Sequence, residues 1–136
     1  MTQENNDKKT IVPLADPKLE VSRGFACEIA RLAYDRHCSE VVILELADRS
    51  PVAKHFVIGT GTSEQQIRSV AHEMEDLGGE QGFPAFGRAG IQQGRWAVVD
   101  FVDVVVHLFD EEYRKFYDLE LLWGDAPRVE WQQNCK

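Results

Sequence analysis

The segment RWAVVDFVDVVVHLF, residues 95–109, alternates in a way that predicts β-structure. It fits two strands with a break near residues 101–103, or one long bent strand. Because successive side chains of a strand point to opposite faces, one face is apolar and the other mixes polar groups with a large aromatic ring. We expect helices to cover the apolar face and to leave the mixed face partly open. The apolar face holds Ala97, Val99, Phe101, Val104, Val106 and Leu108, and the mixed face holds Trp96, Val98, Asp100, Asp103, Val105 and His107.

The segments on either side of this run predict the remaining elements. Two short β-branched runs predict neighbouring strands, and three stretches with apolar residues at helical spacing predict helices. The second helix begins with a capping box of Ser63 and Gln66, and a glycine pair at 78–79 ends it. Asp110 caps the third helix, which ends at Gly124. The predicted order is helix 22–37, strand 41–46, strand 55–60, helix 64–77, strand 85–88, two strands within 95–109 and helix 111–123.

The order α-β-β-α-β-β-β-α predicts a single α/β domain of the α+β kind. We expect one mixed sheet of about five strands, with helices mainly on one face. Residues 22–129 form the predicted domain, residues 1–21 a flexible N-terminal tail and residues 130–136 a C-terminal tail. The length of 136 residues excludes a large multi-domain enzyme, and a hydrophobic content of 43% argues against disorder of the whole chain.

The charge and the cysteines limit the partners and the compartment. Fifteen Lys and Arg against 23 Asp and Glu give a net charge of −8, which disfavours direct nucleic-acid binding and favours a basic partner. No run reaches the roughly 18 to 20 apolar residues of a bilayer span, and the first ten residues lack the apolar core of a secretory signal. The three cysteines leave one over after any pairing and show no Cys-x-x-Cys spacing. We therefore expect no membrane association and a reducing compartment, the cytoplasm.

Residues with catalytic potential form incomplete sets. The turn GTGTS, residues 59–63, joins a strand to a helix N-terminus, where phosphates bind, but it lacks the lysine of a P-loop and the third glycine of a dinucleotide site. We interpret it as a tight structural turn. Asp100 and Asp103 have no clear third carboxylate with which to hold a divalent ion, and the four histidines match no zinc spacing. We therefore predict that the chain is no enzyme and that it has no catalytic residue, metal or cofactor.

Trp96 and His107 share the mixed, partly open face of the predicted sheet. A tryptophan flanked by polar residues on such a face is typical of a protein-binding hot spot. The alternative is that Trp96 packs beneath its own chain. Asp103 and His107 share the face but stand roughly 13 Å apart by the rise of a strand, so they do not touch. We interpret His107 as a polar residue of a docking surface.

Three motifs follow one another along the chain: FVIGTGTS at 56–63, WAVVDFVDVVVH at 96–107 and EEYRKFYDLELLW at 111–123. Together they resemble the ribosomal silencing factor family, also called RsfS or Iojap, over roughly residues 22–129. The resemblance implies a small α/β domain similar in topology to nucleotidyltransferases but without their catalytic residues, often as a homodimer. It also implies binding to protein fourteen of the large ribosomal subunit, where the small subunit docks. Such binding blocks subunit joining and represses translation when nutrients are short.

The resemblance also implies which residues bind the partner, with Trp96 and His107 as the strongest candidates. Three positions depart from the family pattern: Lys54 and Ala89 replace acidic residues, and Val102 replaces a glycine. Two alternative functions are a nucleotidyltransferase-like, nucleotide-binding enzyme and a homodimeric scaffold whose open face pairs with itself. The candidate partner-binding residues are Thr60, Gly61, Trp96, Val98, Asp100, Asp103, Val105 and His107, and Glu111, Tyr117, Leu121 and Trp123 match the third motif.

Overall fold

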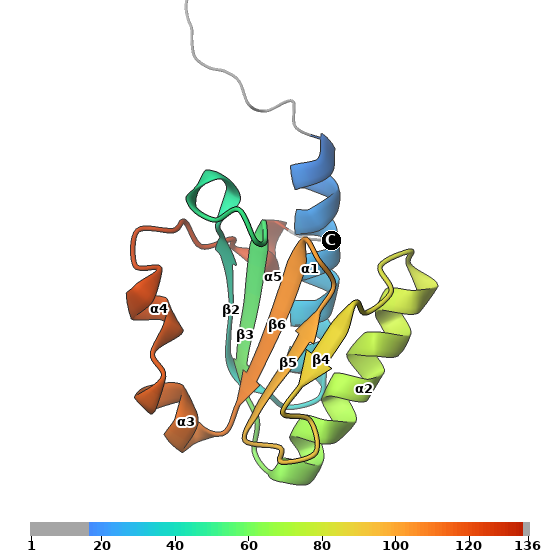
Figure 1. The fold of residues 1–136 in the computed structure, drawn as a ribbon, viewed down its shortest axis with the longest axis vertical. Coiled ribbons are helices and arrows are strands. Elements are labelled where there is room, and N and C mark those ends of the chain that lie inside the picture. The colour runs from blue at the N-terminus through green and yellow to red at the C-terminus, as the bar shows by residue number, and fades with distance from the viewer. Residues whose placement is uncertain (1–16, 135–136) are drawn as a thin grey trace, which may run out of the picture.

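The computed structural model describes residues 17–134, which fold around one five-stranded sheet (Figure 1). The strand order is β2-β3-β6-β5-β4, in which β3 and β6 run parallel and the other neighbouring pairs run antiparallel. The predicted fold class, a single mixed sheet of about five strands, is confirmed. The strands are β2 (Ser39–Glu45), β3 (His55–Thr60), β4 (Gly87–Ala89), β5 (Trp96–Asp100) and β6 (Val104–Phe109).

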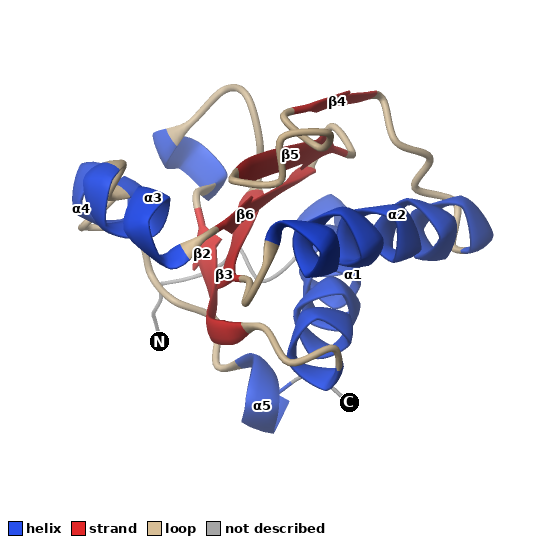
Figure 2. Cartoon of the chain, turned by 90° about the horizontal axis from the view of Figure 1, so that it is seen from below, coloured by secondary structure: helices blue, strands red, loops and turns tan. Residues whose placement is uncertain are grey.

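The helices cover the two faces of the sheet unequally (Figure 2). The long helices α1 (Pro17–Asp35) and α2 (Glu64–Glu80) lie on one face, and the short helices α3 (Glu111–Phe116) and α4 (Leu119–Leu122) lie on the other. Two further short elements are the 3-10 helix η3 (Ala47–Arg49) and α5 (Trp131–Asn134). Within residues 17–134, no helix is both long and apolar enough to cross a membrane.

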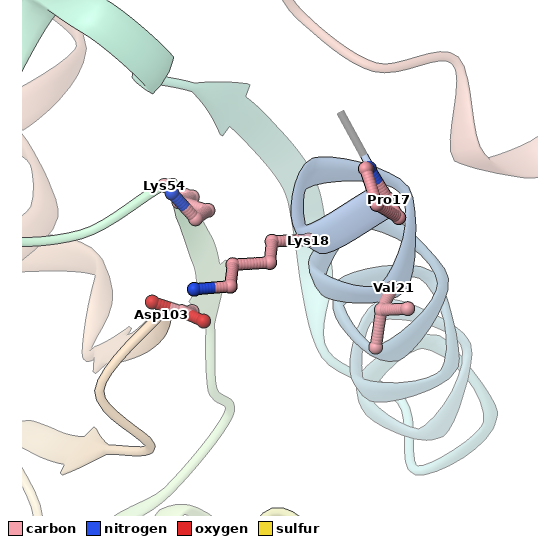
Figure 3. Close-up of a pocket in the computed structure, with 5 residues that line it drawn as sticks. All are labelled: Pro17, Lys18, Val21, Lys54 and Asp103. Atoms are coloured by element: carbon pink, nitrogen blue, oxygen red, sulfur yellow. The ribbon is translucent and has the colours of Figure 1, made fainter. Parts of the chain in front are cut away.

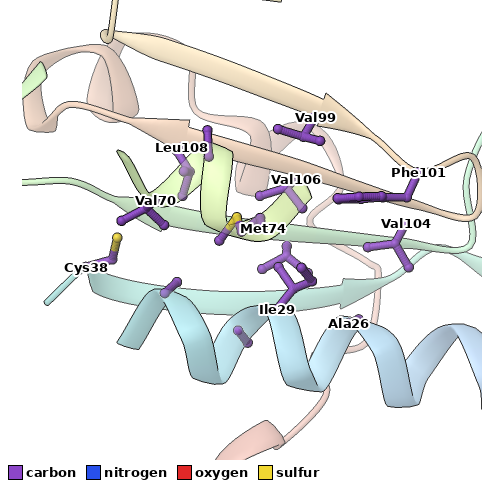
Figure 4. Close-up of a cluster of buried hydrophobic side chains, with 14 of the residues drawn as sticks. Ala26, Ile29, Cys38, Val70, Met74, Val99, Phe101, Val104, Val106 and Leu108 are labelled. Atoms are coloured by element: carbon purple, nitrogen blue, oxygen red, sulfur yellow. The ribbon is translucent and has the colours of Figure 1, made fainter. Parts of the chain in front are cut away.

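Alternation along the strands divides the buried side chains into two cores. The larger core lies between the sheet and the helices α1 and α2 (Figure 4), and it includes the whole apolar set predicted for residues 95–109. The smaller core lies under α3 and α4 and includes Leu44, Ile58 and Phe109. Trp96 and Val98 lie at its margin and are half-buried. The mixed face of the sheet is therefore covered near β2 and β3 and more open at β5.

The strands β5 and β6 form a hairpin, so the alternative of one long bent strand is wrong. The Phe101 N–H donates to the Val104 carbonyl at 2.8 Å, and Asp100 Oδ1 accepts a hydrogen bond from the Val102 N–H at 2.7 Å. Val102 has a φ of +77°, a left-handed conformation that strains a β-branched residue and that glycine adopts freely. The departure noted at Val102 thus places a strained residue at the tip of this hairpin.

Each long helix extends beyond one of its predicted boundaries, α1 at its start and α2 at its end, while α1 ends at Asp35, two residues before its predicted end. Helix α1 begins at Pro17 instead of Ser22, so part of the predicted tail is helical, because proline suits the first turn of a helix. Residues 1–16 lie outside the described part of the chain. Helix α2 runs through the glycine pair and ends at Glu80. A Cβ on Gly78 would overlap the Phe83 carbonyl and the Phe101 ring, so the packing here requires glycine. Gly78 thus serves close packing, and the prediction that it ends the helix is wrong.

Two other predicted boundaries differ. The third helix was predicted to run unbroken from 111 to 123, but it divides into α3 and α4. Asp118 lies in the break, and its carboxylate accepts a hydrogen bond from the Leu121 N–H at 3.2 Å, which makes it a second N-cap. The short strand predicted at 85–88 is shifted by one to two residues, to Gly87–Ala89.

The C-terminal segment packs on the sheet, both at the end of the predicted domain and at the start of the tail predicted for residues 130–136. The Glu45 N–H donates to the Pro127 carbonyl at 2.8 Å, and the Val129 N–H donates to the Ile43 carbonyl at 3.0 Å, so residues 127–129 cover the edge of β2. Trp131 is only 6% exposed, and its indole N–H donates to the Val41 carbonyl at 3.0 Å. One helical turn is too short to show a period in sequence, which explains why α5 was missed.

Candidate functional site

Aromatic rings gather around Trp96 on the face of the sheet opposite α1 and α2. The indole stacks on Phe109, its partner across the β5–β6 pair, with ring centroids 4.9 Å apart. It also lies 4.6 Å from the ring of Tyr117 at the end of α3, and Tyr117 lies 4.8 Å from the ring of Phe116. A continuous strip of rings therefore runs from β5 to the end of α3.

His107 supports this strip from within the sheet. Trp96 Nε1 donates a hydrogen bond to His107 Nδ1 at 3.1 Å, and the ring of Phe56 from β3 lies 4.7 Å away. Only 8% of His107 is exposed. Because burial penalises the charged form, the pKa of His107 falls from 6.5 to about 4. The imidazole is therefore neutral near pH 7 and accepts a hydrogen bond through Nδ1.

Helices α3 and α4 present large apolar side chains to solvent. Phe116 and Leu121 are each 77% exposed, Leu122 is 72% exposed and Tyr117 is 39% exposed. Exposed apolar side chains gathered on one part of a protein are typical of an interaction site. We call Trp96, Phe116, Tyr117, Leu121 and Leu122 the docking surface.

The buried guanidinium of Arg114 attaches the docking surface to the sheet. Its Nε and Nη2 atoms donate to both carboxylate oxygens of Glu120 on α4, at 3.1 and 2.9 Å. Its Nη1 atom donates to the hydroxyl of Thr60 at the end of β3, at 2.9 Å, and to the carbonyl of Glu40 on β2, at 2.7 Å. Bidentate bonds between arginine and a carboxylate are strong and directional. Arg114 therefore fixes α3 and α4 relative to two strands.

The start of α3 is attached through Arg95. Its Nε atom donates to Asp110 at 2.6 Å, and its guanidinium lies 4.2 Å from the ring centroid of Tyr113. Asp110 also accepts a hydrogen bond from the Tyr113 N–H at 2.7 Å, so the predicted N-cap is confirmed. The docking surface is thus held at both ends of its α3 segment.

Four of the eight predicted binding residues are buried. Thr60 is 4% exposed and accepts the hydrogen bond from Arg114, while a Cβ on Gly61 would overlap Ile67. Buried positions such as these present little side-chain surface to a partner. The four are Thr60, Gly61, Val105 and His107.

The structure brings three predicted residues together: Trp96, Val98 and His107. Val98 pairs with His107 across the β5–β6 ladder, and Trp96 bonds to the same imidazole. Trp96 and Val98 are half-buried on the open part of the face. The sequence predicts His107 to be a polar residue of a docking surface, but the structure buries it beneath Trp96, where aromatic rings of the smaller core cover it.

Asp100 and Asp103 lie at the hairpin, at the other end of β5 and β6 from Trp96. Asp103 lines a shallow pocket beside the start of α1, where the Lys18 side chain points toward it and Lys54 lies near (Figure 3). Two lysines therefore line the same pocket as this carboxylate. Neither aspartate belongs to the docking surface, and residues 17–134 contain no group of three side chains that could hold a metal ion.

The glycine-rich turn before α2 uses its N–H groups within the protein. The Gly61 N–H donates to the Phe109 carbonyl at 2.8 Å, and the Thr62 N–H donates to Gln66 Oε1 at 2.7 Å. The predicted cap is present, since Ser63 Oγ accepts from the Gln66 N–H at 3.0 Å. A phosphate would have to displace these bonds, so the turn fits a structural role.

Sequence reasoning missed four residues of the docking surface as candidate binding residues: Phe116, Tyr117, Leu121 and Leu122. The sequence predicts one aromatic side for the whole helix 111–123, whereas the structure packs Tyr113 against the smaller core and leaves Phe116 exposed. The signal that was present is Asp118, a good N-cap residue in the middle of a predicted helix.

Residues 20–136 match the sequence model of the family described as "Ribosomal silencing factor during starvation". The chain belongs to this family. The ribosomal silencing factor RsfS of Halalkalibacterium halodurans is 43% identical over 96 residues, which cover 71% of this chain and 82% of that protein. The ribosomal silencing factor RsfS of Bacillus subtilis is 39% identical over 93 residues, which cover 68% of this chain and 79% of that protein. The resemblance stated from the three motifs is confirmed.

Solved structures share the fold of this ribosomal silencing factor family member. A crystal structure of a Bacillus halodurans protein has a TM-score of 0.67 at 34% identity and covers 82% of this chain and 98% of its own. An X-ray structure of a Chromobacterium violaceum protein has a TM-score of 0.70 at 27% identity and covers 78% of this chain and 86% of its own.

Proposed function

We propose that this silencing factor binds protein fourteen of the large ribosomal subunit and blocks the joining of the small subunit, which represses translation when nutrients are short. Membership of the family supports a role at the ribosome. The observation that carries the proposal is the docking surface, in which the half-buried Trp96 contacts Tyr117 and the Tyr117 ring contacts the exposed Phe116, on a segment anchored by Arg114. Aromatic anchors held in place by their own fold are typical of binding hot spots.

Charge supports a basic partner for this surface. The chain carries a net charge of −8, and Glu111, Glu112 and Asp118 are exposed on or beside α3 and α4. An apolar centre with acidic neighbours complements a basic protein surface, and complementary potentials speed the encounter and select the partner. We propose a binding role in the cytoplasm that is steric and needs no chemical reaction.

Two exposed phenylalanines provide a matched test. Phe116 is 77% exposed within the docking surface, and Phe86 is 80% exposed next to β4 at the edge of the sheet. We expect Phe116→Ala to weaken co-sedimentation with isolated large subunits roughly tenfold, and Phe86→Ala to leave it unchanged. Trp96→Ala, which removes the central anchor, should cost about 2 kcal/mol or more of binding free energy. Small subunits are then added, and the amount of joined ribosome shows how far each variant blocks joining.

The outcomes separate the competing functions. Wild type that stays at the top of the gradient refutes the ribosomal partner. Equal binding by the Phe116→Ala and Phe86→Ala variants refutes the assignment of the surface. A dimer that is seen by sedimentation equilibrium and is lost in the Phe116→Ala variant would identify a second copy of the chain as the occupant.

A further inference from the structure

Only one of the two ring nitrogens of the buried His107 makes a hydrogen bond within the described part of the chain. Its Nδ1 atom accepts the hydrogen bond from Trp96 Nε1 at 3.1 Å. Its Nε2 atom is buried and has no hydrogen-bond partner in the part of the chain that the structure describes. The rings of Phe56 and Phe109 lie 4.7 and 6.2 Å from the imidazole.

The hydrogen bond fixes the tautomer of the imidazole. An indole N–H only donates, so Nδ1 must present its lone pair, and the proton of the neutral ring is on Nε2. The buried Nε2–H group is then an unmet donor, which weakens the fold. A leucine in the same apolar surroundings would carry no such group. Packing alone therefore does not explain a histidine at this position.

The bond to Trp96 does explain it. Trp96 is half-buried, and its ring contacts the rings of Phe109 and Tyr117. A bond at the polar end of the indole selects one rotamer out of those that the open face would allow. A side chain that is ordered before binding loses less entropy when the partner arrives.

We propose that His107 is a positioning residue for docking: it makes no contact with the partner but holds the Trp96 indole in the orientation that the partner meets. This inference rests on the proposed function. It assigns a binding role to a buried residue whose conversion to an apolar side chain favours the stability of the fold and weakens binding.

Two substitutions at the same position test the inference. His107→Leu removes the acceptor and fills the space, whereas His107→Asn places a carbonyl oxygen where Nδ1 lies. We expect His107→Leu to unfold at an equal or higher urea concentration than wild type but to bind large subunits roughly tenfold more weakly. His107→Asn should bind within about threefold of wild type although it unfolds at lower urea. If His107 had a merely structural role, the variant that is less stable would also be the variant that binds more weakly.

A spectroscopic measurement reports on the bond without ribosomes. The Nε1–H signal of Trp96 in a 1H–15N spectrum is identified by its loss in the Trp96→Phe variant. We expect this proton to exchange with solvent at least tenfold faster in the His107→Leu variant. We also expect His107→Leu to add no further loss of binding to the Trp96→Phe variant. If His107→Leu does not fold, His107→Met removes the same acceptor with another apolar side chain of similar size, and the same loss of binding and faster exchange are expected.

The measurements distinguish a failure of the proposed function from a failure of the positioning role of His107. Wild type that does not sediment with large subunits overturns the proposed function, and this inference with it. Wild-type binding together with unweakened binding of the His107→Leu variant overturns only the positioning role. The same conclusion follows if the exchange of the Trp96 Nε1–H is equal in the two proteins.

Discussion

Gly78 and Gly79 are adjacent in α2, yet we expect opposite effects when each is replaced by alanine. A Cβ on Gly78 would overlap the Phe83 carbonyl oxygen and lie 2.5 Å from Phe101 Cε1, whereas no atom of the described residues lies within 4 Å of a Cβ on Gly79. The Phe83 backbone cannot retreat freely, because its N–H donates to the Gly78 carbonyl at 2.7 Å. Overpacking a core costs about 1 to 3 kcal/mol, while alanine gains about 0.5 to 1 kcal/mol of helix propensity over glycine.

Urea unfolding followed by circular dichroism measures both effects. Gly78→Ala should lower the free energy of unfolding by about 1 to 2 kcal/mol, and Gly79→Ala should raise it by about 0.5 kcal/mol. At roughly 4 °C for each kcal/mol, the thermal midpoints should differ by about 6 to 10 °C. Gly79→Ala is the control for propensity because it lies one residue further in the same helix. Shifts in the same direction for both variants would refute the contact argument at Gly78.

Three further predictions concern the hairpin, Arg114 and His107. Val102→Gly should raise the free energy of unfolding by about 1 kcal/mol in urea, because it relieves the left-handed strain; no gain would refute the strain. Arg114→Met should lower it by about 2 to 3 kcal/mol and increase hydrogen exchange in α4, while Arg36→Met, which breaks an exposed ion pair, should change neither. The pKa of His107 is about 6.5 in the unfolded chain and about 4 in the folded protein. The fold therefore keeps its full stability above pH 6.5 and loses stability as the pH falls toward 4, because the unfolded chain takes up the proton first. Between pH 7.5 and 4.5 the wild type should therefore lose about 2.5 kcal/mol more than His107→Leu in urea titrations, and parallel losses would contradict the burial of the imidazole.

The sheet could be predicted from sequence because its strands obey a strict period of two. Ala97 and Val99 face the larger core while Trp96 and Val98 face the other side, as the alternation of residues 95–109 requires. The helix ends could not be predicted equally well. Gly78 predicts a helix stop by propensity, but α2 continues to Glu80, and glycine at this position leaves room for Phe83 and Phe101.

The sequence predicts only Trp96 of the docking surface, because the other four residues lie on or beside two short helices that the sequence pattern does not separate. Trp96 stands out in the sequence as an aromatic residue on a mixed strand face. Phe116 does not, because it belongs to the same aromatic pattern as Tyr113, and only the packing of α3 on the sheet shows which of the two rings stays exposed. The burial of His107 depends on Phe56 from another strand, and a sequence shows such a neighbour only after the strand order is known.

The backbone bonds between residues 127–129 and β2 affect how this protein behaves when it is partly unfolded. If this segment detaches, the run Val41-Val42-Ile43-Leu44 gains an unpaired edge while the rest of the sheet is still intact. Such β-branched edges recruit strands from other molecules and start aggregation. The C-terminal segment therefore keeps the edge strand β2 paired and protects the protein against self-association. A C-terminal fusion or truncation that disturbs it should lower the yield of monodisperse protein more than the same change at the N-terminus.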